Sequence, residues 1–136
     1  MPRSEEPARD SRGTVHREYI ADVRLVELSE GEYRFEAPDH AGRTFGDTEA
    51  AELYADVYFD VNGFVEEGTG ERGVPPVIIQ AGRDTMAAYM LTRPHVDEQW
   101  VGSFMGVQPG KVQRYVSRVR KRAENIRTKA AAEGVA

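Results

Sequence analysis

The sequence has no cysteine and no long apolar run, and lysine occurs only at Lys111, Lys121 and Lys129. Without cysteine the chain has no disulfide, no thiolate-bound metal and no cysteine nucleophile. No window approaches the roughly 18 consecutive apolar residues that a transmembrane helix needs, so we expect no membrane span. Residues 1–17 contain no apolar core of a signal peptide, and we expect a cytoplasmic protein.

Because lysine is scarce, arginine supplies nearly all of the positive charge. Carboxylates outnumber basic residues, 23 against 18, which gives a formal net charge of −5. An acidic, lysine-poor composition resembles that of proteins from salt-loving archaea, in which dense carboxylates keep the surface hydrated. We therefore expect a halophilic, archaeal protein; the alternative is an acidic protein from an arginine-rich bacterial genome.

The charge is unevenly distributed along the chain. Residues 109–136 contain eight cations and two carboxylates, a net charge of +6, whereas residues 1–108 have a net charge of −11. A contrast of this kind is informative about partners rather than about the fold. It indicates that the C-terminal segment binds an anion.

The apolar patterns predict an α+β protein: a small N-terminal β-meander plus a helix, followed by a C-terminal three-helix unit. At 136 residues the chain is long enough to bury a core without a disulfide or a structural metal. Alternating apolar and polar residues, clearest in YRFEA, predict three strands at about 19–28, 32–37 and 43–46. The charged residues 1–17 are predicted to be a disordered tail.

A helix is predicted to begin at Thr48, because Asp47 can accept a hydrogen bond from its first free N–H groups. Its apolar stripe continues at helical spacing as far as Phe64. With the strands it forms a predicted unit over residues 18–66, for dimerisation or for binding a partner. The glycine-rich residues 67–74 are predicted to be a linker.

The remaining helices are predicted within residues 75–129. Pro75 and Pro76 suit a first helical turn, where a missing N–H costs little, and Gly82 would let another helix approach. The expected helices cover about 76–91, 96–105 and 109–127, with a frayed tail over residues 130–136.

The segment MGVQPGKVQRYVSRVR resembles the turn and recognition helix of the helix-turn-helix superfamily, which includes LuxR-type regulators, sigma-factor promoter-binding domains and resolvase-like proteins. That family has a small residue in the first helix, a glycine four positions later, and apolar anchors in the second helix. In this chain the small residue is Gly102, at a position where alanine is commoner, and the turn glycine is Gly106. The apolar anchors are Val107, Val112 and Tyr115. The resemblance covers residues 75–127 and implies binding of double-stranded DNA.

Helical spacing independently gives the last helix two different faces. The first is apolar and is formed by Val112, Tyr115, Val116, Val119, Ala123 and Ile126. The second is cationic and is formed by Lys111, Arg114, Arg118, Lys121 and Arg122. A helix packed down by the first face would present the second to the major groove. The alternative is a basic helix that is simply solvated.

Position along this helix predicts which residues contact DNA. Those near its start would reach base edges: Gln108, Lys111, Gln113 and Arg114. Those further along would meet phosphates: Ser117, Arg118, Lys121 and Arg122. We expect a homodimer, formed through Val119, Ala123 and Ile126 or through the 48–64 helix; the alternative is that these residues pack within one chain.

No catalytic or metal-binding group is evident in the sequence. The histidines His16, His40 and His95 do not have the spacing of metal ligands, and no nucleophile has a neighbouring base motif. We therefore predict no enzyme activity, no cofactor and no metal. The predicted function is that of a small sequence-specific transcriptional regulator. The alternative is a protein–protein adaptor whose basic C-terminal helix binds an acidic partner; an effector is left open.

Overall fold

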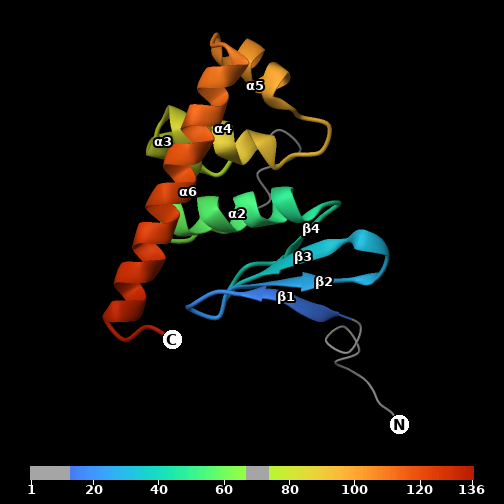
Figure 1. Ribbon diagram of the computed structural model, residues 1–136, viewed down its shortest axis with the longest axis vertical. Helices are drawn as coiled ribbons and strands as arrows, with labels where there is room; N and C mark the ends of the chain where they lie inside the picture. The colour runs from blue at the N-terminus through green and yellow to red at the C-terminus, as the bar shows by residue number, and fades with distance from the viewer. Residues whose placement is uncertain (1–12, 67–73) are drawn as a thin grey trace.

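A computed structural model describes residues 13–66 and 74–136 (Figure 1). Over these residues a four-stranded antiparallel sheet precedes five α-helices, which confirms the predicted α+β class. Most of the predicted disordered tail and nearly all of the predicted linker lie outside the described residues.

The sheet is a meander in which each strand pairs with the next one along the chain. Its strands are β1 (Thr14–Glu18), β2 (Arg24–Glu27), β3 (Tyr33–Glu36) and β4 (Arg43–Phe45). The sequence predicted three strands, and the prediction of a disordered tail over residues 1–17 is wrong for residues 14–17, which lie in β1. All five residues of β1 are exposed, so the strand is held by its hydrogen-bonded register with β2 and shows no apolar alternation.

Two further boundaries differ from the predicted ones. The strand predicted at 19–28 is a turn followed by β2, because Ala21 and Asp22 have φ values of 61° and 60°. The helix predicted at 76–91 is broken at Gly82, whose φ of 119° is incompatible with a helix and favours glycine. Two helices result, α3 (Pro76–Ala81) and α4 (Arg83–Leu91).

Helices α2 and α6 begin where the sequence predicts, and α5 begins at Glu98, two residues after its predicted start. In α2 (Thr48–Asp60) the Asp47 carboxylate accepts a hydrogen bond from the Ala50 N–H at 2.8 Å, so the predicted cap is confirmed. The last two helices are α5 (Glu98–Met105) and α6 (Pro109–Ala132). Helix α6 extends into the segment predicted to fray, and the Ala136 carbonyl accepts a hydrogen bond from the Ala21 N–H.

Helix α2 is the central layer of the molecule. It lies between the sheet and α4, and α6 packs across α4 and α2 and continues toward the sheet (Figure 1). One hydrophobic core includes Phe35 of the sheet, Tyr54 of α2, Tyr89 of α4 and Val119 of α6. Residues 18–66 and 75–129 therefore share a single core.

This packing decides between the two interpretations of the apolar face of α6. Val119 and Ala123 are fully buried within the chain, and Ile126 is partly buried. Most of the apolar stripe of α2 is buried too. The intrachain alternative is thus confirmed for Val119 and Ala123, which cannot form a subunit contact without unpacking the core.

Candidate nucleic-acid interface

A tight turn joins α5 to α6. Gly106 ends α5 in the left-handed conformation, with φ 73°, and the Val107 N–H donates to the Gly102 carbonyl at 2.8 Å. A Cβ atom on Gly102 would lie 2.6 Å from the Val107 carbonyl oxygen, so the turn rests directly on α5 where only a hydrogen fits. The predicted short helix, glycine turn and long helix are all present.

Apolar contacts fix the angle between these two helices. Val101 of α5 and Val112 of α6 are both fully buried, and Tyr115 is nearly so. Asp97 caps α5 by accepting from the Trp100 N–H at 2.8 Å. Helix α6 therefore begins from a defined position, and its exposed side points away from the core.

The exposed side of the first half of α6 is cationic. Lys111, Arg114, Arg118 and Lys121 recur every three or four residues, so they form one stripe, and all four are exposed. We call them the cationic stripe. Among the residues that the structure describes, none of the four forms an ion pair with a carboxylate. Gln108 and Ser117 are exposed as well.

The other arginines of α6 are bound by carboxylates of the chain itself. Arg120 and Arg127 both donate to Asp56 of α2, at 3.0 and 2.9 Å. Arg122 donates to Asp60 of α2 at 2.7 Å. Part of the charge contrast seen in the sequence is therefore internal, because α2 supplies the anions that these arginines meet.

Arg122 was predicted to contact phosphate, and the structure gives it another role. Besides Asp60, its guanidinium donates to Asp84 of α4 at 2.8 Å and to the Thr85 hydroxyl at 3.1 Å. These hydrogen bonds raise the pKa of Arg122, while the same contact outweighs partial burial and lowers the pKa of Asp84. Arg122 thus links α2, α4 and α6, and its guanidinium is occupied by carboxylates of the chain itself.

Gln113 was predicted to contact bases, but it lies on a different side of α6 from Arg114. Its amide Nε2 donates to the Glu98 carboxylate of α5 at 2.9 Å. Adjacent helix positions are turned by about 100°, so closeness to Arg114 in the sequence does not place Gln113 on the same face. Gln113 connects α5 and α6 instead.

Sequence reasoning missed Arg83, the first residue of α4. Its Nη2 donates to the Met105 carbonyl at 3.0 Å and its Nε donates to the Tyr115 hydroxyl at 3.4 Å. This places a further exposed guanidinium beside the cationic stripe. Because 32 residues separate Arg83 from Tyr115, no local pattern could have indicated the contact.

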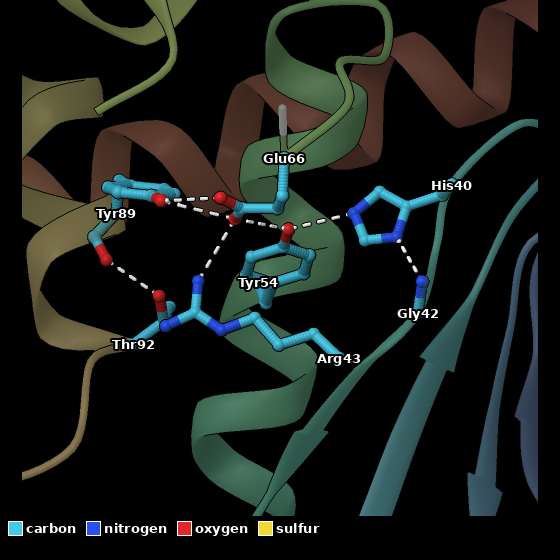
Figure 2. Close-up of polar contacts among 7 residues, drawn as sticks. All are labelled: His40, Gly42, Arg43, Tyr54, Glu66, Tyr89 and Thr92. Carbon is cyan, nitrogen blue, oxygen red and sulfur yellow. Dashed lines mark hydrogen bonds and ion pairs between the residues drawn. The ribbon is translucent and has the colours of Figure 1, made fainter. Parts of the chain in front are cut away.

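A second polar cluster joins the sheet to the helices (Figure 2). Glu66 is its centre: it accepts from Tyr54 at 2.6 Å, from Tyr89 at 3.0 Å and from Arg43 at 3.0 Å. His40 completes the cluster, with its Nε2 at 2.9 Å from the Tyr54 hydroxyl. No local pattern indicated this cluster, since its residues come from residues 40–43, from α2, from the segment after α2 and from α4.

The direction of these hydrogen bonds follows from His40. The Gly42 N–H donates to His40 Nδ1 at 2.9 Å, so a neutral ring has its proton on Nε2 and donates to Tyr54. Burial lowers the pKa of His40 and raises the pKa of Tyr54 and of Tyr89, which keeps all three neutral. Every polar group in this chain of hydrogen bonds already has a partner, so we interpret the cluster as structural.

Comparisons with known proteins add nothing to this geometry. No family model, curated protein or solved structure matches the chain.

Within residues 13–66 and 74–136, no group of three or more histidine, aspartate or glutamate side chains is placed to hold a metal ion. No helix in the same residues is long and apolar enough to cross a membrane.

Proposed function

We propose that this protein binds double-stranded DNA through the cationic stripe of α6 and acts as a small sequence-specific regulator. The observation that supports this most directly is the contrast within α6. Three of its arginines are bound by the carboxylates of α2 and α4, whereas the four cations of the stripe face solvent without such a partner in the described residues.

The dimensions of α6 suit a DNA groove. An α-helix with its side chains is about 10–12 Å across. The major groove of B-form DNA is about 12 Å wide and admits one α-helix. Helix α6 follows a tight turn and is anchored by its buried face. Its exposed side is therefore held in a fixed orientation at the surface.

The rest of the molecule favours this face over any other. Residues 1–108 have a net charge of −11, so this part of the chain as a whole repels a polyanion. Asp56, Asp60 and Asp84 are occupied by arginines and add little repulsion next to α6. A duplex would thus be oriented toward the stripe before any specific contact forms.

Roles within the stripe follow from position along α6. In this proposal Gln108 and Arg114, near its start, contact base edges, and the guanidinium of Arg114 pairs with a guanine. Ser117, Arg118 and Lys121 lie further along and are assigned to backbone phosphates. Lys111 lies next to both groups.

The test is duplex binding by the full chain, measured by fluorescence anisotropy across a potassium chloride series. A target is first selected from random duplexes at high potassium. Arg114→Ala combined with Arg118→Ala should weaken binding to that target by about 10- to 100-fold, the effect of losing one base contact and one phosphate contact. The melting temperature should not change, because both side chains are exposed.

A matched control removes the same charge elsewhere. Arg17→Ala combined with Lys129→Ala also deletes two exposed cations, one on β1 and one in the last turn of α6. This variant should bind the selected duplex as the parent does. If all three proteins bind the duplex with equal affinity, the stripe does not recognise DNA. The same conclusion follows if selection enriches no sequence and an acidic polypeptide binds the protein as well as a duplex does.

A further inference from the structure

Three cations from two helices surround the small part of Tyr115 that is not buried. Lys111 Nζ and Arg118 Cζ each lie 5.9 Å from the centre of the Tyr115 ring, and Arg83 of α4 contacts its hydroxyl. These residues, with Asp84, line a shallow depression of about 400 Å³. We call it the Tyr115 depression.

The guanidinium of Arg83 is held in place but keeps donors to spare. An arginine has five N–H groups. In Arg83 the Nε–H is directed at the Tyr115 hydroxyl and one Nη2–H at the Met105 carbonyl. The other three N–H groups have no partner within the described residues. Arg83 therefore presents a fixed donor edge beside the depression.

Donors predominate throughout the Tyr115 depression. The Tyr115 hydroxyl accepts from Arg83, which leaves its own O–H able to donate outward. The hydrogen bond from Arg83 also lowers the pKa of Tyr115, as expected for a hydroxyl near several positive charges. The single carboxylate, Asp84, already accepts from Arg122 at 2.8 Å and from the Thr85 N–H at 2.9 Å.

We propose that Arg83, Lys111, Arg118 and the Tyr115 hydroxyl together bind one backbone phosphate of the duplex. Two guanidiniums, one ammonium and one hydroxyl around a concave surface match the several acceptor oxygens of a phosphate. This inference rests on the proposed function. It assigns Lys111, which helix position alone grouped with the base contacts, to the phosphate.

A duplex phosphate fits the surroundings better than a free phosphate ion. The depression is continuous with a stripe in which Arg114 and Lys121 also face solvent, and a single small ion would leave those two cations without a partner. A nucleic-acid backbone supplies further phosphates along the same line. Contact through Arg83 would then hold α4 against the DNA backbone beside the groove that α6 enters, and so set the angle between α6 and the duplex.

This phosphate contact should contribute to duplex affinity independently of the base sequence. Arg83→Gln in the full chain should weaken binding to the selected duplex and to an unrelated duplex by the same factor. The slope of log affinity against log salt should become shallower by about 0.9, the effect of one lost phosphate contact. The sequence motif recovered by selection should not change.

Two further variants complete this experiment. Tyr115→Phe keeps the ring and removes the hydroxyl, and it should lower the affinity for both duplexes by about two- to tenfold. Lys129→Gln removes one exposed cation at the far end of α6 and should leave both the affinity and the salt slope unchanged.

The outcomes separate this inference from the proposed function. If the parent binds no duplex, both are wrong. If the parent binds and the Arg114 and Arg118 double variant does not, but Arg83→Gln behaves as Lys129→Gln does, only the phosphate site is wrong. A further experiment titrates inorganic phosphate at constant ionic strength. The duplex-phosphate site is also wrong if the parent binds this ion, Arg83→Gln does not, and the two proteins bind the duplex with the same affinity.

Discussion

Arg122 of α6 binds both carboxylate oxygens of Asp60 of α2, with Nε–Oδ1 at 2.7 Å and Nη2–Oδ2 at 2.9 Å. The Asp60 side chain is only 4% exposed and also accepts from the Thr85 hydroxyl at 2.7 Å. Four positions earlier on the same helix, Arg118 is exposed and has no carboxylate partner in the described residues. Two arginines one helical turn apart thus serve stability and surface charge separately.

This difference predicts that replacing arginine by methionine lowers stability at position 122 and weakens duplex binding at position 118. Arg122→Met should lower the free energy of unfolding by about 2 kcal/mol, because it leaves the Asp60 carboxylate buried without its cation. The figure is below that for a fully buried pair, since the Arg122 side chain is 42% exposed and its charge is screened. Arg118→Met should change stability by less than about 0.5 kcal/mol.

Urea unfolding measures the free energy of unfolding of both variants, and fluorescence anisotropy measures their duplex binding. Arg118→Met should weaken duplex binding, whereas Arg122→Met should bind as the parent does under conditions in which it is folded. A loss of duplex affinity in folded Arg122→Met equal to that in Arg118→Met would mean that Arg122 leaves Asp60 to meet DNA.

The glycine turn supports a second prediction. A Cβ on Gly102 would meet the Val107 carbonyl oxygen at 2.6 Å, whereas a Cβ on Gly110 in the first turn of α6 would meet nothing within 4 Å. Gly102→Ala should therefore lower stability by about 1 kcal/mol or more, since the backbone clash exceeds the gain in helix propensity. Gly110→Ala should raise stability by about 0.4–1 kcal/mol.

Thermal unfolding of the two variants side by side is the appropriate measurement. Both substitutions add one methyl group to a helix, so a difference between them reports the space available and not the helix propensity. Equal stabilisation by both would show that the turn between α5 and α6 is wider than described.

The polar cluster around Glu66 predicts a dependence of stability on pH. Burial lowers the pKa of His40 below its value of about 6.5 in an unfolded chain. Below pH about 6.5 the unfolded chain therefore binds a proton that the folded chain does not. The stability contributed by neutral His40 is present above that pH and is lost as the pH falls toward the lowered pKa.

Urea unfolding between pH 7 and pH 5 should show this loss, with a slope of at most about 1.4 kcal/mol per pH unit for one proton. His40→Gln should reduce the slope. His95→Asn replaces an exposed histidine and should retain it. A slope that is the same in His40→Gln would assign the pH dependence to other groups.

Base recognition gives a fourth prediction. Gln113→Ala should leave the selected DNA motif unchanged, because the Gln113 amide donates to Glu98 and does not lie on the cationic stripe. Arg114→Ala should relax the preference at one position of the motif, at a cost of about 1–3 kcal/mol in discrimination. Selection repeated with each variant is the measurement, and a motif altered by Gln113→Ala would contradict this orientation of α6.

The candidate site was partly predictable because part of it depends on local spacing. Gly106 and Gly102 lie four residues apart, and the stripe from Lys111 to Lys121 repeats at helical spacing, so both could be read along the chain. Arg83 was not predictable, because its place beside Tyr115 depends on how α4 packs against α6. The same limit applies to His40 and Glu66, which meet through Tyr54.

The sequence by itself determined where α2 and α6 begin, the start of α5 to within two residues, and which side of α6 is apolar, because caps and periodicity act within a few residues. It also determined that the C-terminal segment is cationic. Only the tertiary structure decided which of those cations face solvent. Asp56 and Asp60 lie more than sixty residues before Arg120 and Arg122, and only the packing of α2 against α6 brings these charges within hydrogen-bond distance.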